Sequence, residues 1–76
     1  MYFVYVLRDP LTNRKYTGST GKLDRRLSEH QFKKPGYVLI YQEEFESKKA
    51  AQTREMFLKT GDGRRWLANR LTALGL

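Results

Sequence analysis

The chain has 76 residues, so it can bury only a little over about 60% of its unfolded surface, and we expect one small domain over residues 1–76 without a large pocket. It contains no cysteine and a single histidine, which excludes disulfides, thiolate catalysis and any multi-histidine metal centre. No apolar run approaches the roughly 20 residues of a membrane span and no signal-peptide layout opens the chain, so we expect a cytoplasmic protein that does not enter a membrane.

The first predicted strand covers residues 2–8. From Tyr2 to Leu7 its residues are β-branched, aromatic or leucine, with no alternating polar position. A strand of this kind is covered on both faces, so we expect it at the centre of the sheet. Asp9 and Pro10 then suit the first two positions of a β-turn. Residues 14–18 are therefore expected to return as the second strand of a hairpin.

Two tyrosines, Tyr5 and Tyr16, lie in these two strands. Their side chains lie on the same face of the sheet only if the numbers of two residues that pair across the strands have an odd sum. A sum of 21 would place Tyr5 and Tyr16 directly opposite each other. Such a pair can be an aromatic contact that only packs, or it can be part of a site. Gly18 ends the second strand where a side chain would crowd an approaching group, and Thr20 is the predicted cap of the next helix.

The first predicted helix covers residues 21–31. Leu23 and Leu27 form its buried stripe. A second stripe, about 60° around the cylinder, carries Arg26 and His30 at the edge of the core, within reach of the sheet. The ordinary alternatives are a surface ion pair for the arginine and a boundary position for the histidine.

A Pro-Gly pair follows this helix and breaks regular structure, so we expect a loop there. Lys33 and Lys34 make this loop a candidate clamp on a nucleic-acid backbone. An uninterrupted apolar run then predicts the third strand over residues 37–43. Ser47 is the expected N-cap of a second helix over residues 48–60.

The second predicted helix carries a carboxylate on its inward side. Ala51 and Leu58 form the inward stripe, and Glu55 lies in the same stripe. A charge on a face that should be apolar indicates either a wet helix edge or a function. The ordinary alternative is an ion pair with Lys59 one turn later, worth only a few tenths of a kcal/mol.

The last predicted helix covers residues 64–74, with Asp62 as its cap. Trp66 is expected in the core with the leucines of this helix. Arg64 and Arg65 lie in the first turn, where positive charge opposes the helix dipole, so we expect them to contact phosphate groups.

Together these elements predict an α+β fold, with a small three-stranded antiparallel sheet flanked by three helices. The chain carries 15 lysines and arginines against 8 acidic residues, a formal net charge of +7. This charge favours a polyanionic partner at long range, for which a nucleic acid and a membrane surface compete.

The tripeptides FVY at residues 3–5 and YTG at residues 16–18, followed by Arg26, His30 and Glu55, resemble the signature of the GIY-YIG nuclease family. The chain is most similar to the small stand-alone bacterial members and to the N-terminal nuclease domain of excinucleases. The resemblance covers nearly the whole chain, because TREMFLKT and GDGRRWLANRL also look like the corresponding parts of the small members. It implies endonucleolytic cleavage of DNA, as in excision-repair, homing and junction-resolving nucleases.

The resemblance also assigns a role to each candidate catalytic residue. Tyr5 would be the general base, with Tyr16 as the family's other candidate, because adjacent arginine and metal charge favour a phenolate. Tyr16 would hydrogen-bond the water or the phosphate, Arg26 would stabilise developing charge, and His30 would orient the phosphate or serve the leaving group. Glu55 would hold one divalent ion, Mg²⁺ or Mn²⁺, with water and substrate phosphate completing its coordination.

Two other classes of function compete with a nuclease. A non-catalytic nucleic-acid-binding module with the same fold would need the basic residues but no turnover, and a protein-interaction module would need an exposed apolar patch that the pattern lacks. We expect the partner to be DNA, branched or damaged, in repair or recombination, with a protein partner as a source of specificity. The expected backbone contacts are Arg25, Lys33, Lys34, Arg64 and Arg65.

Overall fold

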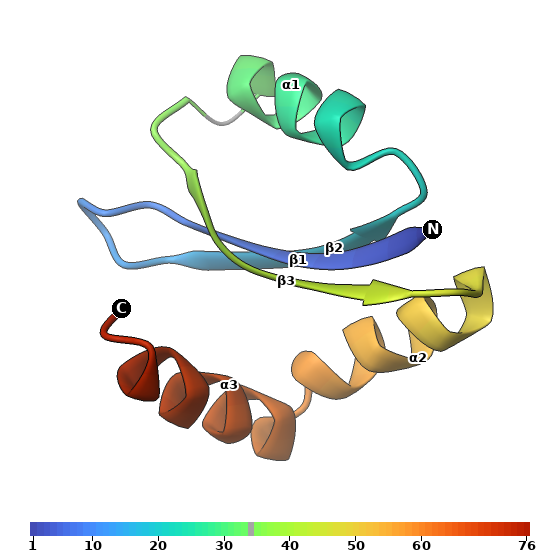
Figure 1. Cartoon of the computed structure of the whole chain (residues 1–76). Coiled ribbons are helices and arrows are strands. Elements are labelled where there is room, and N and C mark those ends of the chain that lie inside the picture. The colour runs from blue at the N-terminus through green and yellow to red at the C-terminus, as the bar shows by residue number, and fades with distance from the viewer. Residues whose placement is uncertain (34) are drawn as a thin grey trace.

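The structure, a computed structural model, describes residues 1–33 and 35–76. Its elements follow one another as two strands, a helix, a strand and two helices (Figure 1). Their bounds are β1 Tyr2–Arg8, β2 Lys15–Thr20, α1 Leu23–Lys33, β3 Val38–Phe45, α2 Lys48–Leu58 and α3 Gly61–Ala73. This is the predicted α+β fold. No helix in the described part of the chain is long and apolar enough to cross a membrane.

β1 is the central strand of the sheet, which has the order β2-β1-β3 with antiparallel neighbours. Its residues Val4, Tyr5, Val6 and Leu7 are all buried. They are buried on both sides because α1 lies over one face of the sheet while α2 and α3 lie over the other (Figure 1). The prediction of a central strand covered on both faces is confirmed.

The turn between β1 and β2 is held by Asp9 and Asn13. The Asn13 amide donates to the Asp9 carbonyl oxygen at 2.7 Å, and the Asp9 carboxylate accepts from the Leu11 amide at 2.9 Å. Asn13 has a φ of 60°, a conformation that asparagine tolerates better than most residues. The turn therefore fixes the pairing of the hairpin, on which the position of both tyrosines depends.

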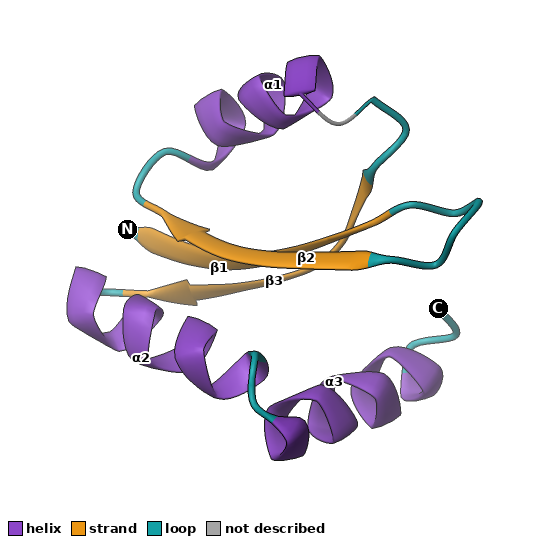
Figure 2. Cartoon of the chain, turned by 180° about the vertical axis from the view of Figure 1, so that it is seen from behind, coloured by secondary structure: helices purple, strands orange, loops and turns teal. Residues whose placement is uncertain are grey.

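The hydrophobic core lies between the sheet and the pair α2 and α3 (Figure 2). Val4 and Val6 point into it from β1, and because side chains alternate along a strand, Tyr5 and Leu7 point to the face beneath α1. The helical residues that pack on the two valines are Ala51, Leu58, Leu67 and Leu71. The predicted inward stripe of α2 is thus confirmed.

α1 covers its face of the sheet loosely. None of its residues is buried, and Leu23 and Leu27, predicted as a buried stripe, are only half-buried. The prediction of Thr20 as the helix cap is also wrong, because α1 begins at Leu23. The Thr20 hydroxyl instead accepts from the Lys22 amide at 3.1 Å, within the turn that precedes the helix.

In both α2 and α3 the N-cap side chain accepts a hydrogen bond from the amide three residues later, and the sequence identified one of these two caps. Ser47 Oγ accepts from the amide three residues further on at 3.1 Å, as predicted for α2. For α3 the cap is Thr60, whose hydroxyl accepts from the Gly63 amide at 3.0 Å. The prediction of Asp62 is wrong because the helix begins earlier than expected, and the Asp62 carboxylate pairs with Arg65.

Gly63 lets α3 start directly against the end of α2. A Cβ atom at this position would lie 1.8 Å from the Phe57 carbonyl oxygen and 2.7 Å from the Leu58 Cα atom. Only a residue without a side chain fits there. The close approach brings the first turn of α3 beside the last turn of α2, and both beside β2.

Trp66 lies at the margin of the core, with 38% of its surface exposed, so the prediction of a core position is wrong. The Arg54 guanidinium lies 4.3 Å from the centroid of its ring, and Tyr41 meets it edge-on at 6.2 Å. Arg54 in turn donates two hydrogen bonds to Glu43, at 2.9 and 3.1 Å. The indole covers a paired arginine instead of filling the interior.

Candidate active site

The register of the hairpin places Tyr5 and Tyr16 on the same face of the sheet. Tyr5 pairs with Gly18, so paired residue numbers sum to 23. The sum is odd, as a shared face requires, but it is not 21, so the tyrosines are diagonal neighbours rather than a directly opposed pair. Their ring centroids lie 6.3 Å apart.

α1 brings His30 onto the same face. The Tyr5 hydroxyl and His30 Nε2 lie 3.0 Å apart, within hydrogen-bonding distance. The His30 ring centroid lies 5.8 Å from that of Tyr5 and 4.8 Å from that of Tyr16. The three rings form one group, which we call the aromatic cluster, and all three members were candidate residues from the sequence.

Gly18 makes room for this cluster. It lies opposite Tyr5 in the hairpin, and a Cβ atom there would be 2.6 Å from the Tyr5 hydroxyl oxygen and 2.7 Å from Tyr5 Cζ. The same atom would be 3.2 Å from Tyr16 Cε1. The absence of a side chain therefore lets the Tyr5 ring extend across β2, the edge strand of the sheet.

Arg26 lies one turn before His30 on α1 and is about half exposed. Its Nη1 is 3.8 Å from Glu29 Oε2, while Arg25 Nε is 3.3 Å from the other oxygen of the same carboxylate. The ordinary alternative, a surface ion pair, is thus present, and such pairs contribute little stability. Arg26 is also close enough to Tyr5 for its charge to act on that hydroxyl.

Glu55 reaches β2 from the opposite layer, and both of its oxygens have partners. Ser19 Oγ donates to Oε1 at 2.5 Å, and Lys59 Nζ donates to Oε2 at 2.6 Å. Burial opposes the charged form, but the hydrogen bonds from Lys59 and Ser19 and the charge of Lys59 lower the pKa of Glu55 below its usual value. The alternative expected from the sequence, an ion pair with Lys59, is confirmed.

The carboxylate and the aromatic cluster meet at the edge of β2. Ser19 follows Gly18 in the strand, so its side chain points to the face of α2 while the Tyr5 ring passes over Gly18 on the other face. The Glu55 charge acts on Tyr5 across this edge and raises the pKa of the phenol. The sequence analysis missed Ser19, although strand alternation with the correct register identifies it.

Tyr5 has a raised pKa, the opposite of the expectation from the sequence. Burial is the largest cause, followed by the charge of Tyr16, and together with Glu55 they outweigh the lowering effect of Arg26 and raise the pKa to about 12. Tyr5 therefore carries its proton at neutral pH in the protein alone. A role as general base requires positive charge beyond what these side chains supply.

The model of the GIY-YIG catalytic domain matches residues 1–68. The chain belongs to the GIY-YIG family. Members of this family are nucleases. Among solved structures, the chain is similar to the solution NMR structure of a UPF0213 protein from Bacillus halodurans, with 26% identity over 91% of this chain and 84% of that chain and a TM-score of 0.59. No curated protein matches it at a significant level.

The residues expected to contact the DNA backbone lie in different parts of the GIY-YIG fold. Arg25 and Arg65 are each engaged in an ion pair on their own helix. Lys33 is exposed at the last residue of α1, and Lys34 lies outside the described residues. Arg64 lines a hollow beside β2. Arg25 and Lys33 belong to α1 and Arg64 and Arg65 to α3, and these helices lie over opposite faces of the sheet, so the structure does not gather the four described residues into one surface.

The Glu55 site suits a hard divalent cation such as the one expected for a GIY-YIG nuclease. The Lys59 ammonium already lies 2.6 Å from Oε2, so the position accepts positive charge. Within residues 1–33 and 35–76, no group of three or more His, Asp and Glu side chains could hold a metal ion. A single carboxylate is compatible with Mg²⁺, which binds one or two carboxylates and takes water and substrate phosphate as its other ligands.

Proposed function

We propose that this GIY-YIG chain is a metal-dependent endonuclease that hydrolyses phosphodiester bonds of DNA in repair or recombination, within a single domain spanning residues 1–76. The observation that carries the proposal is the meeting of the aromatic cluster with the Glu55 carboxylate at the edge of β2. Phosphodiester hydrolysis needs a group that accepts the proton of water, positive charge beside the phosphate oxygens, and a partner for the leaving oxygen. A different side chain at this edge can fill each role.

In the proposed mechanism, the Tyr5 hydroxyl passes its own proton to His30 Nε2, 3.0 Å away, as it accepts the proton of the attacking water, so the phenol is neutral before and after the step. The protonated His30 then gives its proton to the leaving oxygen. Tyr16, the second candidate base, positions the water or the phosphate. Arg26 stabilises the charge that develops on the phosphate oxygens. Glu55 would hold Mg²⁺ or Mn²⁺, which would supply Lewis-acid polarisation of the phosphate.

A non-catalytic DNA-binding module remains the second candidate, because two observations favour it. Lys59 occupies an oxygen of Glu55, and the raised pKa of Tyr5 opposes its action as a base. The two functions separate when the chain is incubated with supercoiled, flapped and branched DNA, with and without Mg²⁺ or Mn²⁺. Nicks that require the cation support the nuclease, whereas binding without nicks on all three substrates supports the module.

The variant Glu55→Gln tests the mechanism, because it keeps the size of the side chain and removes its charge. Cation-dependent nicking should be lost, while DNA affinity measured without divalent cation should persist or rise slightly, since one negative charge near the phosphates is gone. The matched control is Glu46→Gln, which removes an exposed carboxylate outside the site and should nick like the wild type. Nicking by Glu55→Gln at the wild-type rate would remove Glu55 from the mechanism.

Glu55→Gln should also lower the stability of the fold slightly. Glu55 has Ser19 and Lys59 as partners and a lowered pKa. We therefore expect a small loss, about 0.3–0.5 kcal/mol for the helical pair, and a slightly lower Tm at pH 7.

A further inference from the structure

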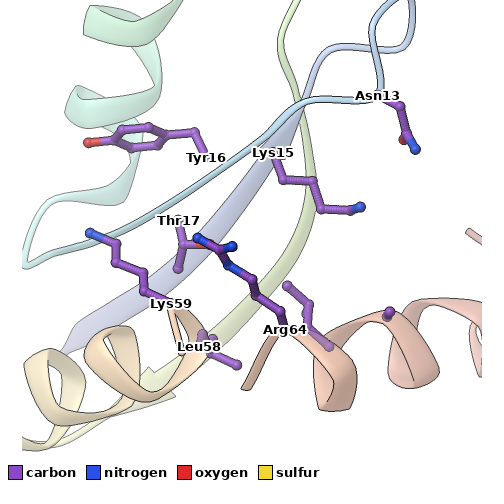
Figure 3. A pocket seen from close by; sticks show the side chains of 9 residues that line it. Asn13, Lys15, Tyr16, Thr17, Leu58, Lys59 and Arg64 are labelled. Atoms are coloured by element: carbon purple, nitrogen blue, oxygen red, sulfur yellow. The ribbon is translucent and has the colours of Figure 1, made fainter. Parts of the chain in front are cut away.

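A basic hollow of about 550 Å³ lies beside β2, on the face of the sheet that carries α2 and α3 (Figure 3). Three cationic side chains line it, Lys15, Lys59 and Arg64, and each comes from a different part of the fold. The buried core residues Leu58 and Leu67 form its floor. Figure 3 shows the three cationic side chains around the hollow, while the Tyr16 ring points away from it.

Strand alternation and one glycine bring the three cations together. Lys15, Thr17 and Ser19 point to the same face of β2, so the hollow continues directly from the residue that binds Glu55. Lys59 follows the last turn of α2. Arg64 stands beside it because Gly63 lets α3 start against that turn.

The charge in this hollow is only partly compensated. Lys59 is paired with Glu55 on its other side. Among residues 1–33 and 35–76, neither Lys15 nor Arg64 forms an ion pair. Both side chains are exposed, so an anion that enters the hollow can draw their charged ends toward it.

We propose that Lys15 and Arg64 together hold one backbone phosphate of the DNA strand that is cut. This proposal rests on the proposed nuclease function and adds a second point at which the same strand is held. Strand residues are spaced by about 3.3 Å, so Thr17 and Lys15 lie about 7 and 13 Å along β2 from Ser19. One DNA strand has about one phosphate per 3.4 Å of duplex axis, so a strand that runs along β2 places the bound phosphate within about four nucleotides of the one at Glu55.

Salt dependence of DNA binding tests the contact without any need for cleavage. Each neutralised phosphate contributes about 0.9 to the slope of log affinity against log salt. Because Lys15 and Arg64 share one phosphate, Lys15→Ala, Arg64→Ala and the double variant should each lower the slope by no more than about 0.9. If the two residues held separate phosphates, the double variant would lower the slope by twice that amount. Between 50 and 200 mM salt, wild-type affinity should then fall about 3.5-fold more than that of the double variant.

A matched control removes one positive charge on α2, away from the hollow. Lys49 lines a separate groove with Phe45 and Phe57, so Lys49→Ala should keep the wild-type slope. Thermal melts should show that all variants remain folded, because Lys15 and Arg64 are exposed. An unchanged slope in the double variant, an equal loss in Lys49→Ala, or a slope that falls by about 1.8 in the double variant would overturn the shared phosphate.

Cleavage mapping tests the position of the phosphate. Oligonucleotides that carry one neutral methylphosphonate linkage are cut by the wild type, and each nick reports its own distance from that linkage. Wild-type protein should avoid nicking within about four nucleotides of the neutral linkage on one side, and the double variant should show no such avoidance. Uniform nicking by the wild type would refute the placement. A chain that binds DNA with the predicted slopes but never nicks would refute the nuclease proposal and leave only the phosphate contact.

Discussion

Gly18→Ala is the most direct test of the aromatic cluster, because its consequence can be worked out from distances. The new Cβ atom would lie 2.6 Å from the Tyr5 hydroxyl oxygen, and ordinary contact begins at 3.4 Å, so the hydroxyl must move by the difference of about 0.8 Å. A move of this size stretches its 3.0 Å contact with His30 beyond hydrogen-bonding distance. A misplacement of about 1 Å near the reacting groups can lower a rate on the order of 10²-fold. We expect nicking of supercoiled DNA to fall by about that factor.

The fold should survive this substitution. Overpacking costs about 1–3 kcal/mol, and replacing a strand glycine with alanine returns roughly 0.5–1 kcal/mol. A net loss of about 1 kcal/mol corresponds to a decrease in Tm of roughly 4–8 °C for a domain of this size. The matched control is Gly61→Ala, where a Cβ atom meets nothing within 4 Å and nicking should be unchanged. Wild-type nicking by folded Gly18→Ala would show that the Tyr5 hydroxyl position does not limit the reaction.

Three further outcomes are expected. Gly63→Ala should lose about 3 kcal/mol or more, measured from its urea midpoint, because its Cβ atom would lie 1.8 Å from a backbone oxygen. The Tyr5 pKa is raised from 10.0 to about 12, so on raising the pH the unfolded chain loses this proton before the folded protein does. The contribution of Tyr5 to the free energy of unfolding should therefore be constant below pH 10 and fall between pH 10 and 12. Thermal melts of Tyr5→Phe over the same pH range should lack this decline. Arg26→Ala should lower the single-turnover rate of bound DNA while Arg25→Ala should raise the DNA concentration required, and equal effects of both on both parameters would contradict the assignment.

The sequence predicted those elements of the fold for which local chemistry and burial favour the same structure. The apolar run around Val4 and Val6 allowed only a strand covered on both faces, and Ser47 before a helical pattern allowed only one cap. The odd sum required for Tyr5 and Tyr16 also holds, since the turn at residues 9–13 sets it. The exact sum was not predictable, because it depends on how many residues the turn takes up.

The predictions from the sequence were wrong where tertiary contacts outweighed the local structural preference of a residue. Asp62 is a good cap in isolation, but Thr60 caps α3 because Gly63 lets the helix begin three residues earlier than its apolar pattern suggests. Trp66 was expected inside, yet it covers Arg54, which is held by Glu43 from the neighbouring strand. Neither partner lies near Trp66 in the sequence, so no local pattern could indicate the contact.

Glu55 is an exception to the rule that the inward stripe of a helix is apolar, and this exception was informative. A carboxylate in the apolar stripe of α2 indicated a function, and the structure places it at the rim of the core with Ser19 and Lys59 as partners. These partners lower the pKa of Glu55, so the charged form is already stable in the protein alone. A lysine on a flexible stem is a counterion that a divalent cation can displace without changing the backbone. The charged form therefore does not depend on a bound metal, and the carboxylate that we propose as the metal ligand is ionised beside the aromatic cluster.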